Sequence, residues 1–287
     1  MDVSSAPDLR GRICLVTGAN RGIGMATSIA LARAGGHVVM VCRDEIRAKA
    51  ALDEMRESAA SNLGEYLIAD LSSQQSIRDL ANEFKHRHDR LDVLVNNAAT
   101  VSEVRQTTVD GRELTFAVNH LAYFLLTRSL LDRVLAAGTG VVINVAATNH
   151  RDVVENAEDL DSVNGYEMRE VYKRSKLANV SFTLELARRL GSAARVNALC
   201  PSVNATELLM QFRRVPVEQW SERLAAEAPP STAARVIMSL VAAPGTGRYL
   251  EEGVDVTPSP LACDRDLARR LWNRCSELTG LRADGST

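Results

Sequence analysis

The sequence predicts a single α/β domain in which a doubly wound parallel sheet of about seven strands carries helices on both faces. Short apolar runs alternate with longer amphipathic stretches along the 287 residues. The short runs are apolar throughout instead of at every second position, which is typical of strands buried on both faces. No repeat, low-complexity tract or Pro/Gly-rich linker divides the chain, so we expect residues 1–287 to form one domain.

The apolar runs and the stretches between them define the expected elements in order. We expect strands at 12–17, 37–42, 66–69, 91–96, 140–146, 195–200 and 248–250. We expect helices at 22–34, 44–60, 73–88, 112–137, 170–190 and 232–242. The first helix has apolar residues on one face and ends at Gly35-Gly36, and acids open the second, where they suit the positive end of a helix.

Charge and composition exclude several classes of protein. With 34 Lys+Arg against 36 Asp+Glu, the chain has no electrostatic reason to bind nucleic acid or an anionic membrane. No signal peptide and no apolar stretch of membrane-spanning length can be identified. The five cysteines show neither a CxxC pair nor metal-ligand spacing and are interpreted as reduced packing residues. We therefore expect a cytoplasmic protein without membrane insertion, a nucleic-acid partner or a metal.

A glycine-rich turn follows the first expected strand, where residues 17–24 read Thr-Gly-Ala-Asn-Arg-Gly-Ile-Gly. This GxxxGxG spacing is a variant of the dinucleotide fingerprint, in which glycines let the backbone approach a pyrophosphate at a helix N-terminus. Such turns also occur for packing reasons, but the strand–turn–helix context favours a Rossmann-type cofactor site. The residues expected to bind the cofactor here are Gly18, Asn20, Arg21, Gly22, Ile23 and Gly24.

The residues at the end of the second expected strand favour NADP(H) over NAD(H). An NAD enzyme carries an acid there for the ribose 2′-hydroxyl, whereas this chain has Cys42 and Arg43, followed by Asp44. Arg21 and Arg43 could together bind a 2′-phosphate, which matches the geometry of guanidinium groups. The alternative is that both arginines are solvated surface residues.

Four longer motifs follow further along the chain: Val-Asn-His-Leu at 118–121, Ser-Lys-Leu-Ala-Asn-Val at 175–180, Glu-Leu-Ala-Arg-Arg-Leu at 185–190 and Ala-Arg-Arg-Leu-Trp at 268–272. With the glycine turn, they resemble the short-chain dehydrogenase/reductase (SDR) superfamily over residues 10–280, and in detail its retinol-dehydrogenase-like branch. The resemblance implies that Asp70 and Leu71 flank the adenine, and that the floor of the cofactor site is formed by Asn96, Asn97 and Ala98. It also implies a homodimer or homotetramer that pairs through the two longest helices.

Tyr172 and Lys176 supply a YxxxK pair. Four residues apart on a helix, they project from one face, and a cation beside a phenol lowers its pKa. We therefore expect Tyr172 to exchange a proton with the substrate near neutral pH. The resemblance further implies that Tyr172 and Lys176 contact the cofactor, with Lys176 on the nicotinamide ribose, and that Asn119 supports a proton relay through water.

The family places a catalytic serine at the end of the fifth strand, and this chain has Ala147 at that position. Removing one such hydrogen-bond donor typically costs ~10²–10³ in rate. Thr148 carries a hydroxyl one residue later, and it can replace the serine only if the strand has already ended. Ser202 is a further candidate, whereas Asn149 and His150 are expected at the rim.

A second departure follows the sixth strand, where the family has Pro-Gly and then a threonine that holds the carboxamide. Thr206 keeps its place, but Ser202 replaces the glycine, and a position that requires a positive φ would not accept serine freely. The family uses the next segment, here about 204–230, as a mobile cover over the substrate. Its apolar residues predict an apolar or aromatic small substrate, although they could instead pack on the core.

Taken together, these features predict an NADP(H)-dependent oxidoreductase that interconverts a carbonyl and an alcohol on an apolar small molecule, with Tyr172 as acid or base. Ala147 leaves a non-redox enzyme of the same fold open: a dehydratase, isomerase or cyclase. A nucleotide-binding protein with altered catalysis, such as a sensor, is the third possibility. The YxxxK pair argues against the sensor, because a sensor has no use for a tuned phenol.

Overall fold

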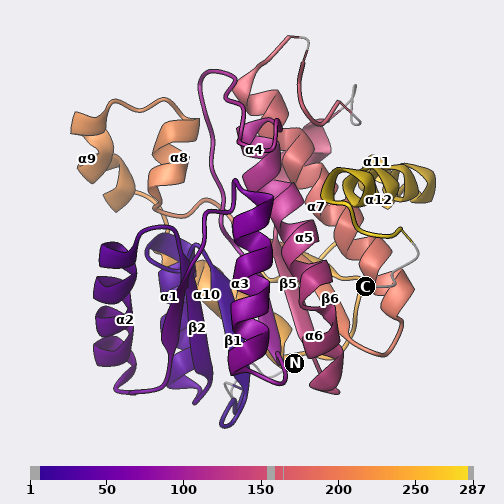
Figure 1. The fold of residues 1–287 in the computed structure, drawn as a ribbon. Coiled ribbons are helices and arrows are strands. Elements are labelled where there is room, and N and C mark those ends of the chain that lie inside the picture. Colours follow the sequence, from indigo (N-terminus) through magenta and orange to yellow (C-terminus); the bar gives the residue numbers. More distant parts are fainter. Residues whose placement is uncertain (1–6, 154–158, 164, 284–287) are drawn as a thin grey trace.

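Eight strands form one sheet in the computed structural model, which describes residues 7–153, 159–163 and 165–283 (Figure 1). The strand order is β3-β2-β1-β4-β5-β6-β7-β8. The bounds are β1 Ile13–Thr17, β2 His37–Cys42, β3 Glu65–Ile68, β4 Val93–Asn96, β5 Val141–Val145, β6 Arg195–Cys200, β7 Tyr249–Glu251 and β8 Val254–Asp255. All neighbouring pairs are parallel except β7 and β8. The predicted fold class is confirmed, with the short antiparallel β8 added to the expected strands.

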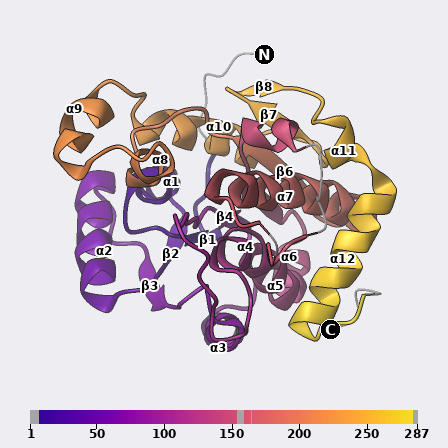
Figure 2. The ribbon, with the colours of Figure 1, turned by 90° about the horizontal axis from the view of Figure 1, so that it is seen from above.

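Helices cover both faces of the sheet (Figure 2). One face carries α1 (Gly22–Arg33), α2 (Glu45–Ala59) and α10 (Pro230–Ala242). The other carries α3 (Gln74–Arg87), α5 (Ala122–Ser129), α6 (Leu131–Ala136), α7 (Met168–Leu190) and α12 (Arg265–Thr279). The shorter elements are α4 (Leu114–Phe116), η1 (Ala117–Leu121), η2 (Thr148–Asp152), α8 (Glu207–Phe212), η3 (Val217–Gln219), α9 (Trp220–Ala225) and α11 (Pro260–Cys263).

The strands are buried on both faces, as their apolar runs predict. In β1, Cys14 and Val16 pack in the core under α1, α2 and α10, whereas Leu15 packs in the core on the opposite face. All three side chains are fully buried. Burial on both faces requires an apolar residue at every position, which is why these strands show no alternation of polar and apolar residues.

The single helix predicted at 112–137 is wrong in detail, because the segment is divided. Its helical part begins at α4, where the carboxylate of Glu113 accepts hydrogen bonds from the first backbone N–H groups. A wide π-helical turn, η1, follows, and the backbone leaves the helical conformation again at Leu130 between α5 and α6. Within the wide turn, the side chain of Asn179 on α7 donates a hydrogen bond to the carbonyl oxygen of Asn119 at 2.8 Å. Such turns accompany groups inserted into the helical ladder.

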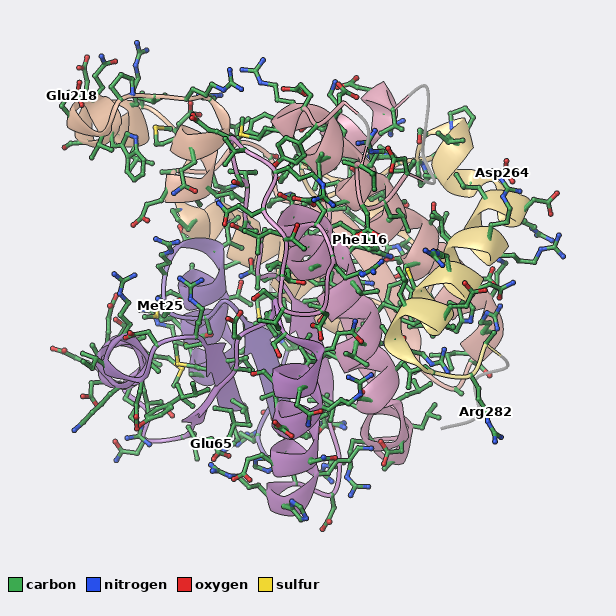
Figure 3. The ribbon with its side chains drawn as sticks, turned by 45° about the horizontal axis from the view of Figure 1, so that its top comes forward. Met25, Glu65, Phe116, Glu218, Asp264 and Arg282 are labelled. Atoms are coloured by element: carbon green, nitrogen blue, oxygen red, sulfur yellow. The ribbon has the colours of Figure 1, made fainter. Side chains whose placement is uncertain are left out.

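Residues 204–230, called the lid segment here, project from the body beside α1 and α2 (Figure 1). Figure 3 labels Glu218 near the tip of this projection. A β-bridge between Asn204 and Ala228 joins the two ends of the segment, and the N–H of Ala205 bonds the Ala228 carbonyl at 2.8 Å. The segment is therefore closed at its base while its helices extend outward.

Candidate active site

A cavity of about 980 Å³ lies at the carboxyl ends of the parallel strands. The loops after β1, β2, β4, β5 and β6 line it, together with α7 and the lid segment. In open parallel sheets this edge, where the strand order changes direction between β1 and β4, is the usual place for a ligand. Of the residues predicted for the site, all line the cavity except Gly24, Asn96, Asn119 and His150.

The glycine turn forms a cradle that no other residue type would fit. A Cβ on Gly18 would lie 2.9 Å from the Cα of Ala98, and a Cβ on Gly24 would lie 2.1 Å from the Gly18 carbonyl oxygen. Gly18 also has a φ of +64°, which disfavours other residues. Gly24 thus acts behind the turn by allowing close packing, and the turn leaves backbone facing the cavity at the N-terminus of α1. This arrangement fits the pyrophosphate of a dinucleotide.

Asn97 and Thr17 hold the glycine turn to the loop after β4. The Asn97 amide donates to the Thr17 carbonyl oxygen at 2.9 Å, and the Thr17 hydroxyl accepts from the N–H groups of Asn97 and Ala98 at 2.9 and 3.1 Å. Asn96, in contrast, is fully buried and its amide bonds Thr127 and Asn144. The expectation that Asn96 lines the cofactor floor is therefore wrong, because its side chain points into the core between β4 and β5.

Three arginines gather where the 2′-phosphate was expected. Arg21, Arg43 and Arg47 all line the cavity. Burial, followed by the positive charges of Arg47 and Arg43, lowers the pKa of Arg21, so the three guanidinium groups lie close enough to repel one another. Arg21 also forms an ion pair with Glu207 of the lid segment. Arg47 was not singled out from the sequence, although its position four residues after Arg43, at the start of a predicted helix, could have identified it.

Tyr172 and Lys176 project from α7 into the cavity. The Lys176 ammonium donates a hydrogen bond to the carbonyl oxygen of Val145, the last residue of β5, at 3.0 Å. Its Nζ lies 5.5 Å from the centre of the Tyr172 ring. This hydrogen bond attaches α7 to the end of β5 and fixes the amine beside the phenol.

The predicted lowering of the Tyr172 pKa is not observed in this structure. Burial raises the pKa of Tyr172, and the neighbouring Cys200 thiol adds to the rise. Burial lowers the pKa of Lys176 to about 8. Removal from water thus outweighs the attraction between the two groups, so the phenol carries its proton and can act as a proton donor.

Asn119 lies behind the cavity instead of lining it. Its fully buried side chain donates to the Thr100 carbonyl oxygen at 2.9 Å and accepts from the Thr100 N–H at 2.7 Å. Its backbone carbonyl oxygen accepts the Asn179 amide. The relay role expected from the resemblance stays a prediction, and in this structure Asn119 fixes the backbone at Thr100, which does line the cavity.

Ala147 and Thr148 lie at the end of β5, and both line the cavity. The strand ends at Val145 and Thr148 is the first residue of η2, so the condition for Thr148 to present its hydroxyl to the cavity is met. Thr148 also contacts the Cys200 thiol. Burial raises the pKa of that thiol, and hydrogen bonds from Thr148 partly offset the rise. Cys200 was interpreted as a packing residue, and its place in the cavity was missed because its strand runs to the edge of the site.

His150 is buried, and its predicted rim position is wrong. Its Nδ1–H donates to the Ala147 carbonyl oxygen at 2.8 Å, and its Nε2 accepts the Ser259 N–H at 3.1 Å. The ring packs edge-on against Tyr249 at 4.9 Å, and burial lowers the pKa of His150. A neutral imidazole therefore fixes the turn that carries Ala147, while Asn149 is half-buried and lines the cavity.

The loop after β6 keeps the backbone conformation that a glycine would favour. Ser202 has a φ of +63° and lines the cavity. The Asn204 amide donates to the carbonyl oxygens of Pro201 and Ser202, which stabilises this strained turn. Thr206 caps α8 by accepting the Leu209 N–H at 3.3 Å, and its methyl group lies 3.4 Å from where a Cβ on Gly22 would be.

The lid segment places apolar side chains over Tyr172. The Phe212 ring lies 4.9 Å from the Tyr172 ring. Leu208, Leu209 and Leu224 also line the cavity. Met210 is the one residue of α8 that is buried, and no described residue of η3 or α9 is buried, so this segment does not pack an apolar face on the core.

Comparison with known sequences gives the same family over most of the chain. The model of the short chain dehydrogenase family matches residues 12–216. Human retinol dehydrogenase 13 is 37% identical over 97% of this chain and 88% of its own length, and human retinol dehydrogenase 14 is 34% identical over 95% and 88%. Human polyprenol dehydrogenase is 31% identical over 96% and 87%.

Comparison with solved structures supports the same conclusion. An uncharacterised protein from Mycobacterium paratuberculosis has a TM-score of 0.80 at 30% identity, covering 98% of each chain. A protein described as an NAD(P)-dependent gluconate 5-dehydrogenase from Beutenbergia cavernae, solved with bound NADP, has a TM-score of 0.69 at 27% identity, covering 86% of this chain and 97% of its own. The chain therefore belongs to the short-chain dehydrogenase/reductase superfamily, in its retinol-dehydrogenase-like branch.

Proposed function

We propose that this oxidoreductase uses NADP(H) to interconvert a carbonyl and an alcohol on an apolar small molecule. The observation that carries the proposal is one continuous cavity that joins the glycine cradle, the arginine cluster and the Tyr172–Lys176 pair. A dinucleotide at the cradle would extend towards Tyr172, because the same cavity ends at α7. Binding site and proton donor are thus arranged for hydride transfer to a carbonyl carbon.

The chain's own residues supply the proton and hold the reacting groups, and the bound cofactor would supply the hydride. Tyr172, whose pKa is raised by burial, donates its proton to the carbonyl oxygen during reduction, and in the reverse direction its phenolate accepts the proton of the alcohol. Lys176, held by the Val145 carbonyl, keeps the amine beside the phenol. Thr148 offers the hydroxyl closest in sequence to Ala147, and we assign it the hydrogen bond to the substrate oxygen.

The preference for NADP(H) rests on the arginine cluster. A 2′-phosphate carries two negative charges, and Arg21, Arg43 and Arg47 supply guanidinium donors without an acid at the end of β2. Asp44 is engaged as the N-cap of α2, where its carboxylate accepts the Arg47 N–H at 2.8 Å. The Beutenbergia protein, with its bound NADP, is consistent with this choice.

An apolar substrate is proposed from the lid segment and from the names of the relatives. Phe212 and the leucines of α8 and α9 line the cavity next to Tyr172. Pockets of this kind bind ligands mainly through apolar contact, with a few polar groups that fix orientation. Relatives named for retinol and polyprenol suggest long apolar alcohols and their carbonyl forms.

NADPH consumption with a panel of apolar aldehydes and ketones tests the proposal, comparing the native protein with Ala147→Ser and Tyr172→Phe. We expect the native protein to turn over, Ala147→Ser to change the rate little, and Tyr172→Phe to lose most activity while still binding NADPH. Turnover by Ala147→Ser alone would instead favour the non-redox alternative, in which the Tyr172–Lys176 pair serves a dehydration, isomerisation or cyclisation.

A further inference from the structure

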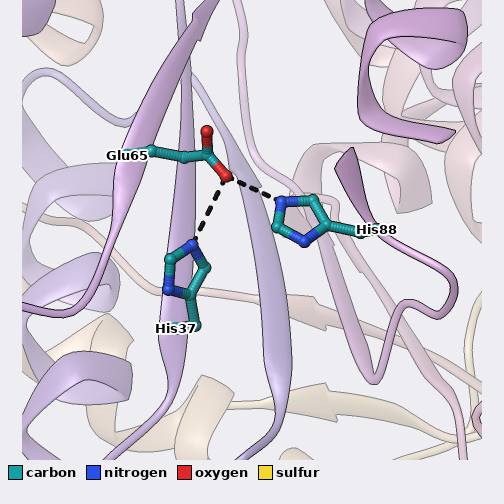
Figure 4. Close-up of side chains that lie close together, drawn as sticks. All are labelled: His37, Glu65 and His88. Atoms are coloured by element: carbon teal, nitrogen blue, oxygen red, sulfur yellow. Dashed lines mark hydrogen bonds and ion pairs between the residues drawn. The ribbon is translucent and has the colours of Figure 1, made fainter. Parts of the chain in front are cut away.

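Three side chains with metal-binding atoms meet at the amino ends of the strands, on the opposite side of the sheet from the carboxyl ends that border the cavity. His37 is the first residue of β2, Glu65 is the first residue of β3, and His88 follows the last residue of α3. Figure 4 shows both imidazole rings directed at the same carboxylate oxygen. None of the three lines the cavity, and Glu65 lies far from the lid tip at Glu218 (Figure 3).

The distances are close to those of a coordinated ion. Nε2 of His88 lies 2.7 Å and Nε2 of His37 lies 3.4 Å from Oε1 of Glu65, and the three atoms are within 4.8 Å of one another. Ligands held about 2.0–2.2 Å from a tetrahedral ion are about 3.3–3.6 Å apart. The three atoms therefore need to move by about 1 Å or less to surround an ion.

The carboxylate of Glu65 is held in place by its neighbours. Arg87 binds the second oxygen, Oε2, which leaves Oε1 for the imidazoles. Because Arg87 also pairs with Glu83 at 2.6 Å, its positive charge is offset by a second carboxylate. Groups that orient a ligand in this way raise metal affinity.

We propose that His37, Glu65 and His88 bind a divalent transition-metal ion of the Zn²⁺ type. Two imidazoles and one carboxylate are the donor set that Zn²⁺ accepts, with water in the remaining position. The side chains are 34%, 24% and 12% exposed, in the order His37, Glu65, His88, so an ion and a water molecule can reach them. On binding, each imidazole gives up its N–H···O bond to Glu65 and coordinates through Nε2.

The role that follows is structural, because the ion would connect the starts of two strands with the end of a helix. Sequence reasoning predicted no metal, since it examined cysteine spacing, whereas these ligands are separated by 28 and 23 positions. Only the pairing of β2 with β3 and the packing of α3 bring them together.

Calorimetric titration of the metal-free protein with ZnCl₂ tests the site, in a Cys263→Ser background that removes the exposed thiol. We expect one Zn²⁺ per chain and a rise in Tm of about 5 °C or more at a hundredfold excess over Kd. His88→Gln and Glu65→Gln should each weaken binding by about tenfold or more. His86→Gln is the matched control, because His86 is an exposed neighbour on the same helix outside the cluster.

NADPH binding reports whether each variant is folded, since the cofactor cradle lies at the carboxyl ends of the strands, away from the three ligands. Absence of stoichiometric Zn²⁺ binding by the parent protein overturns the proposal. So does binding that His88→Gln and Glu65→Gln leave unchanged, or that His86→Gln weakens equally. Because Glu65→Gln keeps the size and shape of the side chain, it remains informative if His88→Gln does not fold.

Discussion

Arg43, just before α2, and Arg47, in its first turn, line the cavity. The 2′-phosphate of NADPH would lie beside them. We predict that Arg43→Ala and Arg47→Ala each raise the KM for NADPH by about tenfold, because a hydrogen bond to a charged group contributes about 1.5–3 kcal/mol. The KM for NADH should change little, since NADH has no 2′-phosphate. Arg269→Ala, an exposed arginine on α12, is the control. Equal shifts for both cofactors would show that the arginines do not select the phosphate.

The lowered pKa of Lys176 leads us to predict that the rate of carbonyl reduction depends on pH. Burial lowers its pKa from 10.5 to about 8, so the ammonium is present below about pH 8 and is lost as the pH rises through that value. The kcat/KM profile of the free enzyme should therefore fall above about pH 8. Lys176→Arg should shift this fall in kcat/KM to higher pH, because arginine keeps its charge. A profile that stays level to pH 10 would contradict this role.

Sequence reasoning identified the residues of the site better than their environments. The glycine turn, Tyr172 and Lys176 all line the cavity, because local motifs place them at the ends of predicted strands and helices. The burial of His150 and the raised pKa of Tyr172 depend on packing against distant residues such as Tyr249 and Cys200. No local pattern carries that information.

At the scale of elements, the lid segment contacts Tyr172 through Phe212. The Phe212 ring packs against the Tyr172 ring at an interplanar angle of 50°, and Arg169 lies 5.7 Å from the Phe212 ring centre. We predict that Phe212→Ala lowers kcat/KM for apolar ketones by up to about tenfold, since an aromatic pair contributes about 0.5–1.5 kcal/mol beyond its buried area. Val217→Ala, at a lid position that is 71% exposed, is the matched control. An equal effect of both substitutions would mean that Phe212 has no specific role.

The ends of helices were predicted correctly where a polar or glycine residue follows an apolar or helical stretch of sequence. They were missed where contacts with distant parts of the chain determine them. Gly35-Gly36 ends α1 and the Asp44 carboxylate begins α2, both as local rules predict. The division of 112–137 involves the Asn179 side chain, which belongs to another helix. A composition that favours one long helix gives no sign of such a contact.

At the scale of the whole molecule, α12 covers the helices through which a homodimer or homotetramer was expected to form. The Trp272 ring stacks on Phe182 of α7 at 5.9 Å and meets Phe124 of α5 at 5.1 Å, with Arg189 above it at 4.1 Å. Nearly every residue of α7 from Arg174 to Ala187 is buried within the chain itself. Figures 1 and 2 both show α12 lying along this face.

We therefore predict that the protein does not pair through α5 and α7 and is a monomer of 31.2 kDa in solution. Light scattering coupled to size-exclusion chromatography measures this mass directly. Twice that mass would mean that another surface forms the interface, or that α12 moves away. Trp272→Ala distinguishes the two, because it should promote association only if α12 covers the pairing surface.

The parallel sheet could be predicted from the sequence pattern, whereas the cellular compartment could not. Buried strands that alternate with helices require parallel crossovers, and the glycine turn after the first strand sets the cofactor edge. Among the described residues, no helix has both the length and the apolar character needed to cross a membrane. A cytoplasmic location stays a prediction, and of the cysteines interpreted as packing residues, Cys263 is exposed.

The central claim is that the cavity carries out hydride transfer with Tyr172 as proton donor although Ala147 provides no hydroxyl. NADPH deuterated at C4 of the nicotinamide, incubated with an apolar ketone and the native protein, tests it most directly by mass spectrometry of the products. We predict one deuterium on the carbinol carbon, and none when Tyr172→Phe is used. Conversion of the substrate while the label stays on the nicotinamide would contradict the claim and show that the nucleotide is bound without being consumed.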